Sequence, residues 1–104
     1  DVQNWHLASM LNRVCSEKFT LLLPFDGRIP DTGVFLWLAR QNGCSTDISV
    51  IRQEIPSQPI STPWILSIRS ASFSALPSWM QQQHFSLQST ESHEEWLLEA
   101  WKKD

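Results

Sequence analysis

The chain has 104 residues, of which 41% are hydrophobic, and it contains 6 Trp and 5 Phe. This length fits one domain, and the apolar content supports a packed core, which excludes an intrinsically disordered chain. The formal net charge is -3, and no basic cluster occurs beyond Lys102-Lys103. Because nonspecific nucleic-acid binding depends on a positive surface, we expect no direct nucleic-acid partner.

The first part of the chain predicts two helices with a strand between them. Residues 2–16 carry apolar side chains at helical spacing and predict a helix, which we assign to an N-terminal extension over residues 1–18. The continuous apolar run 19–23 predicts a central strand that is buried on both sides. A second helix is expected over residues 31–41, and it ends near Gly43 because glycine tolerates the left-handed conformation found after helices.

The middle of the chain predicts three further elements after a second strand. That strand is expected within residues 46–55, and the three prolines of residues 56–63 predict a loop rather than a helix. The apolar residues 64–70 predict a third strand, and residues 70–83 a short helix. The alternation of apolar and polar residues in 84–90 indicates a more exposed fourth strand.

The closing segment carries the signals of a capped helix. Ser92 and Glu95 have the spacing of a capping box, in which each side chain bonds the backbone amide of the other residue. Trp96, Ala100 and Trp101 then fall on one apolar stripe that can face a sheet. The sequence therefore predicts that the chain ends on a helix that docks against the rest of the domain.

These elements define an expected architecture. Their order after the extension is β-α-β-β-α-β-α, and strands separated by helices favour a parallel sheet. We therefore predict a single α/β domain over residues 19–104, in which helices flank a four-stranded, mainly parallel sheet. The extra N-terminal helix would lie outside this domain.

No motif for catalysis or for cofactor binding occurs in the chain. The glycines form neither a dinucleotide-binding nor a P-loop pattern, and His6, His84 and His93 lie far apart in sequence. Asp26 follows the first strand, where open α/β sheets place their ligands, but an Asp-Gly pair also forms ordinary turns. We therefore expect no catalytic, cofactor, metal or small-molecule site.

The cysteines and the hydropathy bear on the cellular setting. Cys15 and Cys44 are too few for a disulfide framework, so we expect free thiols in a reducing compartment, with a single bridge between them as the alternative. No signal peptide is evident, and no apolar run approaches the ~20 residues of a membrane helix. Because the chain starts at Asp1 rather than Met, we interpret it as a domain of a longer intracellular protein.

Several local patterns resemble the BRCT domain. The turn after the first helix has Gly43 where that family has a glycine, although Cys44 replaces the usual second glycine. The third strand, with Thr62 and Trp64, is similar to the family's Thr-x-hydrophobic-hydrophobic pattern. The closing segment resembles the signature last helix, in which a tryptophan is followed four residues later by a small residue, here Ala100.

The resemblance covers roughly residues 19–103 and implies a nuclear scaffold protein in DNA damage response or replication. Phosphopeptide-binding members of the family use a Ser or Thr near the end of the first strand and a Lys on the second helix. This chain has Asp26 at the first place, which would repel phosphate, and no lysine in residues 75–83. We therefore predict protein partners that are bound without phosphate recognition.

Two other classes of protein stay open as alternatives. A degenerate receiver-like domain shares the parallel sheet, and an enzyme fragment with a thioredoxin-like fold shares a proline before the third strand, here Pro63.

Most tryptophans are expected in the core, because they occur at helical or strand spacing. Trp96 is the expected core anchor, whereas Trp101, Trp5 and Asp26 are the candidate interface residues.

Overall fold

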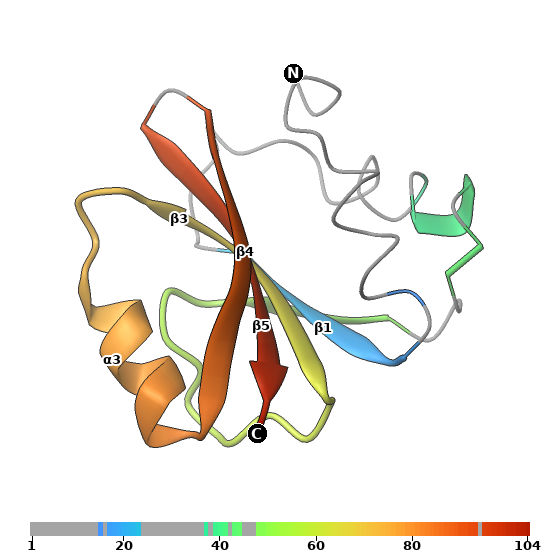
Figure 1. Cartoon of the computed structure of the whole chain (residues 1–104), viewed down its shortest axis with the longest axis horizontal. Coiled ribbons are helices and arrows are strands. Elements are labelled where there is room, and N and C mark those ends of the chain that lie inside the picture. Colours follow the sequence, from blue (N-terminus) through green and yellow to red (C-terminus); the bar gives the residue numbers. More distant parts are fainter. Residues whose placement is uncertain are drawn as a thin grey trace.

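The computed structural model describes residues 15, 17–23, 37, 39–41, 43–44, 48–93 and 95–104. Within these residues the elements are β1 (Phe19–Leu23), β2 (Ser49–Arg52), β3 (Trp64–Ser70), α3 (Ala75–Gln82), β4 (Phe85–His93) and β5 (Trp96–Lys103). Figure 1 shows the strands crossing the middle of the domain, with α3 on one side.

The sheet is five-stranded and mixed, with the order β2-β1-β3-β5-β4. β1 is parallel to β2 and β3, whereas β5 is antiparallel to β3 and β4. The predicted four-stranded, mainly parallel sheet flanked by helices is therefore wrong. The closing segment adds a fifth strand between β3 and β4 and reverses the direction of pairing there.

The closing segment is β5, so the predicted last helix and its capping box are wrong. Ser92 belongs to β4, and Glu95 lies in the turn before β5. A helix with Trp96 and Ala100 on its buried stripe would leave Leu98 outside that stripe, whereas a strand buries all three on one face. The strand also gains backbone partners on both sides, and this outweighs the helix propensity of Leu, Glu, Ala and Lys.

Most other elements agree with the sequence. β1 and β3 have the predicted bounds, α3 lies inside the predicted helix, and β4 begins one residue into the predicted fourth strand. Of the helix predicted over residues 31–41, residues 37 and 39–41 are helical, and the others lie outside the described residues. Most of the predicted N-terminal helix also lies outside them, and Cys15 is in a turn. None of the described helices is long and apolar enough to cross a membrane.

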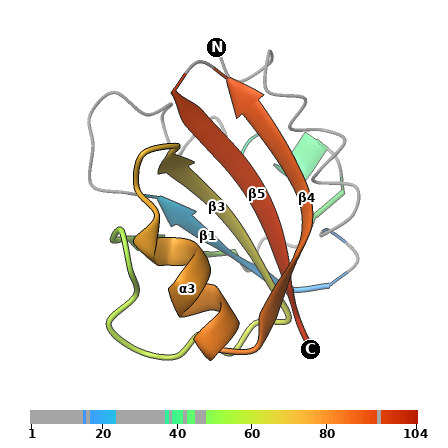
Figure 2. The ribbon, with the colours of Figure 1, turned by 60° about the vertical axis from the view of Figure 1, so that its left-hand side comes forward.

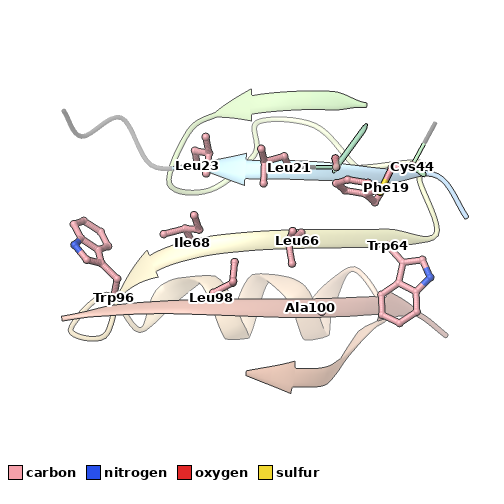
Figure 3. Packing of buried hydrophobic residues seen from close by; sticks show 11 residues of the cluster. Phe19, Leu21, Leu23, Cys44, Trp64, Leu66, Ile68, Trp96, Leu98 and Ala100 are labelled. Carbon is pink, nitrogen blue, oxygen red and sulfur yellow. The ribbon is translucent and has the colours of Figure 1, made fainter. Parts of the chain in front are cut away.

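The core consists of two clusters on opposite faces of the sheet. The α3-face cluster lies under α3, and its buried members are Leu22, Ile60, Ile65, Leu76, Met80, Phe85 and Trp101. Figure 2 shows α3 packed on this face, beside β4. The opposite cluster contains Phe19, Leu21, Leu23, Ala39, Cys44, Trp64, Leu66, Ile68, Trp96, Leu98 and Ala100 (Figure 3). Because β1 and β3 are covered on both faces, all five residues of β1 and the first five of β3 are buried.

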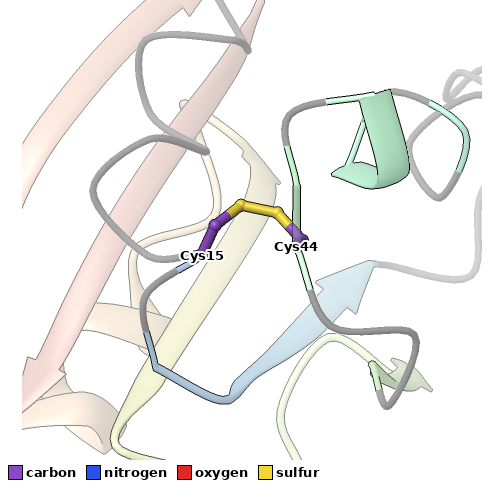
Figure 4. Close-up of a disulfide and its surroundings, with 2 residues drawn as sticks. All are labelled: Cys15 and Cys44. Carbon is purple, nitrogen blue, oxygen red and sulfur yellow. A yellow bond between two sulfur atoms is a disulfide. The ribbon is translucent and has the colours of Figure 1, made fainter.

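A disulfide joins Cys15 to Cys44, which are 29 positions apart in sequence (Figure 4). The expectation of free thiols is therefore wrong, and the alternative of a single bridge is correct. Cys44 is buried in the opposite cluster, and Cys15 packs against it. The expected reducing compartment was inferred from free thiols. Because disulfides persist mainly in oxidising compartments, the Cys15–Cys44 bridge removes that support.

Candidate functional site

A groove of about 410 Å³ lies on the α3 face of the sheet, between α3 and β4. Its lining comes from four elements and comprises Arg69, Pro77, Gln81, Phe85, Ser86, Leu87, Glu99 and Trp101. Pro77 and Gln81 are four residues apart on α3 and therefore share one side of the helix. Phe85 and Leu87 are two residues apart on β4 and therefore share one face of the sheet. Each wall of the groove is therefore formed by side chains that the local periodicity places on one face of its element.

A buried ion pair lies in this groove. The Nε of Arg69 donates to Oε1 of Glu99 at 2.6 Å, and the side chain of Glu99 is only 4% exposed. The Nη1 of Arg69 also donates to the carbonyl oxygen of Phe73 at 2.7 Å, which ties the segment before α3 to the sheet. The carboxylate compensates the guanidinium charge, so the groove carries no uncompensated cation among its described lining residues.

Trp101 forms the apolar base of the groove. Its side chain is 3% exposed, and its Nε1 donates to the hydroxyl oxygen of the fully buried Ser67 at 3.0 Å. This corrects the expectation that Trp101 is an interface residue. A tryptophan on a central strand has neighbours on both sides, and α3 covers this one.

Leu87 is the exposed apolar residue of the groove, with 45% of its surface accessible. Sequence reasoning placed Phe85 and Leu87 on one face of a strand, which is correct, but it did not single out Leu87. The α3-face cluster covers Phe85 and not Leu87. The sequence signal was an apolar residue that is followed by polar residues over the rest of the strand. The register shift between Leu87 and Ser89 is visible only in the structure.

A second pocket, of about 500 Å³, lies at the other end of the sheet. It is formed by β2 and the proline-rich loop that follows, and its lining residues are Val50, Ile51, Arg52, Gln53, Pro56, Ser57, Gln58 and Pro59. Most of these residues belong to one continuous stretch of chain. The pocket therefore brings together fewer separate elements than the groove does.

The residues that carry the BRCT resemblance have different outcomes. Gly43 has a positive φ of 79°, and its N–H donates to the carbonyl oxygen of Arg40, so it ends the helix as predicted. Thr62 and Thr20 share a hydroxyl hydrogen bond of 2.7 Å, which fixes the start of β3 beside β1. Trp96 and Ala100 are buried, but in β5 rather than in a last helix.

The remaining predicted residues do not form a site in the described part of the chain. Trp5, His6 and Asp26 lie outside it. His84 is at the turn between α3 and β4, and His93 ends β4. Among the described residues, no group of three or more His, Cys, Asp or Glu side chains is arranged to hold a metal.

Comparison of the chain with protein-family models, with curated proteins and with solved structures found no match. The class of protein is therefore defined by the structure alone, as a small α/β domain with a mixed sheet and a groove beside one edge strand. The resemblance to the BRCT family stays a prediction, without the last helix that was its most distinctive part.

Proposed function

We propose that this chain is a non-catalytic protein–protein interaction domain that binds an extended segment of a partner protein in the groove between α3 and β4. The observation that supports this most is Leu87, an apolar side chain that is 45% exposed at a groove whose other apolar lining residues are buried or half-buried. An exposed apolar residue beside a concave surface is typical of recognition sites.

The chemistry of the lining favours a neutral partner segment. Gln81 and Ser86 offer donors and acceptors for a peptide backbone, and Leu87 offers apolar contact. The guanidinium of Arg69 is engaged by Glu99 and by two backbone carbonyl oxygens, so it is a poor receptor for phosphate. We therefore propose recognition of an uncharged segment, without dependence on phosphorylation.

The proposed function is limited to the interaction surface, whereas the BRCT resemblance also implied a cellular pathway. A role in DNA damage response or replication rests on the BRCT resemblance, whose signature residues Trp96 and Ala100 lie in a strand. A Cys15–Cys44 disulfide is not typical of nuclear proteins, which are kept reduced. The proposal therefore concerns the interaction surface and does not extend to a nuclear pathway.

Affinity capture with three forms of the chain tests this function. The wild-type chain, Leu87→Asp and Ile55→Asp are used as baits, and captured proteins are read by mass spectrometry with and without phosphatase treatment. Ile55 is the matched control, because it is an exposed apolar residue in the loop after β2, away from the groove. We expect a protein that is retained by the wild type and Ile55→Asp, in both phosphatase conditions, and lost with Leu87→Asp.

Two results would contradict the proposal. Equal capture by the wild type and Leu87→Asp would remove the groove as the binding surface. Loss of the partner after phosphatase treatment would mean that phosphate is recognised despite the Arg69–Glu99 pair. Circular dichroism of both variants establishes that they remain folded before either result is read.

A further inference from the structure

The Arg69–Glu99 pair leaves one donor and one acceptor under-used inside the groove. The Nε of Arg69 bonds Oε1 of Glu99 at 2.6 Å. Its Nη1 donates to the carbonyl oxygens of Ser70 and Phe73. The remaining contact, from Nη2 to Oε2, measures 3.5 Å and is therefore weak. Among the described residues no other group bonds to these two atoms, so both can bind a ligand.

Burial makes the incomplete bonding of these two atoms costly. The side chains of Arg69 and Glu99 are 12% and 4% exposed, and both line the groove. A buried polar group without a full partner carries a desolvation cost that an exposed group does not. A ligand that bonds both atoms removes this cost, so the pair selects a ligand by its pattern of donors and acceptors.

The group that fits this pattern is a primary carboxamide. Nη2 needs an acceptor and Oε2 needs a donor beside it, and the side chain of Asn or Gln carries both on one carbon atom. The same arrangement lets these side chains bond the adjacent donor and acceptor of adenine. A carboxylate has no donor for Oε2, and an ammonium or guanidinium has no acceptor for Nη2.

Two other neutral groups fit less well. A trans peptide group points its C=O and N–H in opposite directions, so the partner backbone cannot bond both atoms at once. A hydroxyl group has both functions on one oxygen atom, as water has, and therefore gains little over a water molecule that it displaces. The carboxamide is the group that the pair distinguishes best.

The register of the sheet relates this pair to Leu87. Leu87 lies opposite Trp101, which is two residues from Glu99 along β5. Two residues of a strand span about 7 Å, and an extended ligand spaces its alternate side chains by the same distance. A segment that runs along the strands, with an apolar side chain on Leu87, therefore brings the side chain two positions away to Glu99. Because that carboxylate is buried, the longer stem of Gln suits it better than that of Asn.

The charges at the other end of the groove agree with an uncharged ligand. The Nζ of Lys103 lies 5.2 Å from the ring centroid of Phe85, and the carboxylate of Asp104 accepts a hydrogen bond from the hydroxyl of Ser86. These two consecutive residues have opposite charges, so this end attracts neither an acidic nor a basic segment strongly.

We infer that the groove selects an extended segment with an apolar residue and, two positions away, a carboxamide side chain that bonds Arg69 and Glu99. The carboxamide oxygen accepts from Nη2 of Arg69, and its NH2 group donates to Oε2 of Glu99. This inference rests on the proposed function, and it names the chemistry by which the groove recognises its partner segment.

Selection from a phage-displayed library of random peptides of about ten residues, on the immobilised full chain, tests the inference. Groove peptides are those whose binding is lost with Leu87→Asp and kept with Ile55→Asp. We expect them to share an apolar residue and, two positions away, a carboxamide residue, glutamine more often than asparagine.

Synthetic variants of one groove peptide measure the contribution of the carboxamide by isothermal titration calorimetry. Methionine in place of glutamine has a similar length but bonds neither atom, so it should raise Kd by about tenfold. Glutamate in its place should raise Kd by more than that, because its carboxylate meets the carboxylate of Glu99.

A variant of the pair should reverse this preference. Glu99→Gln leaves the charge of Arg69 uncompensated, so the glutamate form of the peptide should then bind about tenfold more tightly than the glutamine form. A merely structural role of Glu99 would weaken both peptides alike. Arg69→Met/Glu99→Leu removes the pair and should bind the glutamine and methionine forms equally. Circular dichroism establishes that each variant is folded, and the double variant serves as the test if Glu99→Gln is not.

Two results would overturn the inference and leave the proposed function standing. One is a set of groove peptides without a carboxamide residue at the expected position. The other is a preference for the glutamine form that persists after the pair is changed. A library that yields no peptide dependent on Leu87 would instead overturn the proposed function, and the inference with it.

Discussion

The two halves of the sheet, which share β3, are built in different ways. In the parallel half, β2 and β1 have four and five residues, and a long connection separates them in sequence. In the antiparallel half, β4 and β5 have nine and eight residues and follow one another directly. Parallel pairs need crossover connections, whereas antiparallel neighbours form a local hairpin with little loop-closure entropy.

This difference predicts where the stability of the domain lies. The Cys15–Cys44 disulfide and the packing of Cys44 against the opposite cluster constrain the parallel half. The antiparallel half depends instead on its long ladders, on the buried Arg69–Glu99 pair and on α3. The parallel half should therefore be more sensitive to the crosslink, and the antiparallel half to individual side chains.

The largest effect is expected from Trp96→Ala, at the start of β5. The indole is 6% exposed in the opposite cluster, so its removal leaves a cavity and should lower the free energy of unfolding by about 3–5 kcal/mol. Trp37→Ala is the matched control, because Trp37 is 56% exposed and its loss should cost less than about 0.5 kcal/mol. Urea unfolding followed by far-UV circular dichroism measures both. Similar losses in the two variants would place Trp96 outside the core.

Removal of the disulfide should have the next largest effect on stability. It should affect the parallel half of the sheet more than the antiparallel half. For a bridge between positions 29 apart, the loss of loop-closure entropy predicts a destabilisation of about 3–4 kcal/mol in Cys15→Ser/Cys44→Ser. Native-state hydrogen exchange should show faster exchange in β1 and β2, with smaller changes in β4 and β5. A uniform increase along the chain would mean that the halves unfold together and that the comparison between them does not hold.

Breaking the ion pair should test the antiparallel half. Glu99→Ala leaves the guanidinium of Arg69 buried without its carboxylate, and this should cost about 3 kcal/mol. The double variant Arg69→Met/Glu99→Leu replaces both charges with apolar groups of similar size and should recover most of that loss. Urea unfolding of the wild type, Arg69→Met, Glu99→Leu and the double variant gives the coupling energy, and Glu99→Ala is measured beside them. A double variant as unstable as Glu99→Ala would show that the cost comes from lost packing.

Sequence reasoning identified the strands of the parallel half because their burial leaves a direct signature. β1 is a run of five buried residues, which a short central strand requires and an amphipathic helix does not. The proline-rich segment before β3 excluded a helix there. These inferences depended on local constraints, and the structure agrees with them.

The failure at β5 has the opposite cause. WLLEAWKK is rich in helix formers and follows a plausible capping box, so local propensity favoured a helix. What makes it a strand is nonlocal, namely β3 and β4 on its two sides. Leu98, which a helix would have left outside the apolar stripe, was the one local sign of the strand.

The groove could not be predicted because its two walls come from elements whose packing was unknown. The sequence analysis did not single out Glu99, and only the strand assignment places it beside Arg69. Trp101 was placed on the apolar stripe of the predicted helix and named as a candidate interface residue, whereas it is buried on a central strand. The wrong assignment of this one element therefore hid the site that both residues help to form.

The smallest expected effect concerns the turn that leads into the antiparallel half. His84 connects α3 to β4 with a positive φ of 64°, a conformation that costs a residue with a Cβ about 1–2 kcal/mol and glycine very little. Its N–H donates to the carbonyl oxygen of Gln81, and its own carbonyl oxygen accepts from the N–H of Asp104, and His84→Gly keeps both bonds.

After the greater flexibility of glycine in the unfolded chain is subtracted, His84→Gly should raise the free energy of unfolding by about 0.5–1 kcal/mol. Gln83→Gly is the matched control, because Gln83 is the preceding residue and has a negative φ of -91°. There glycine relieves no strain and should destabilise by about 0.5–1 kcal/mol. Opposite signs in the two adjacent variants, measured by urea unfolding, would assign the gain to the backbone conformation of His84. A lower free energy of unfolding in both variants would mean that the contacts of the His84 side chain contribute more than the backbone strain costs.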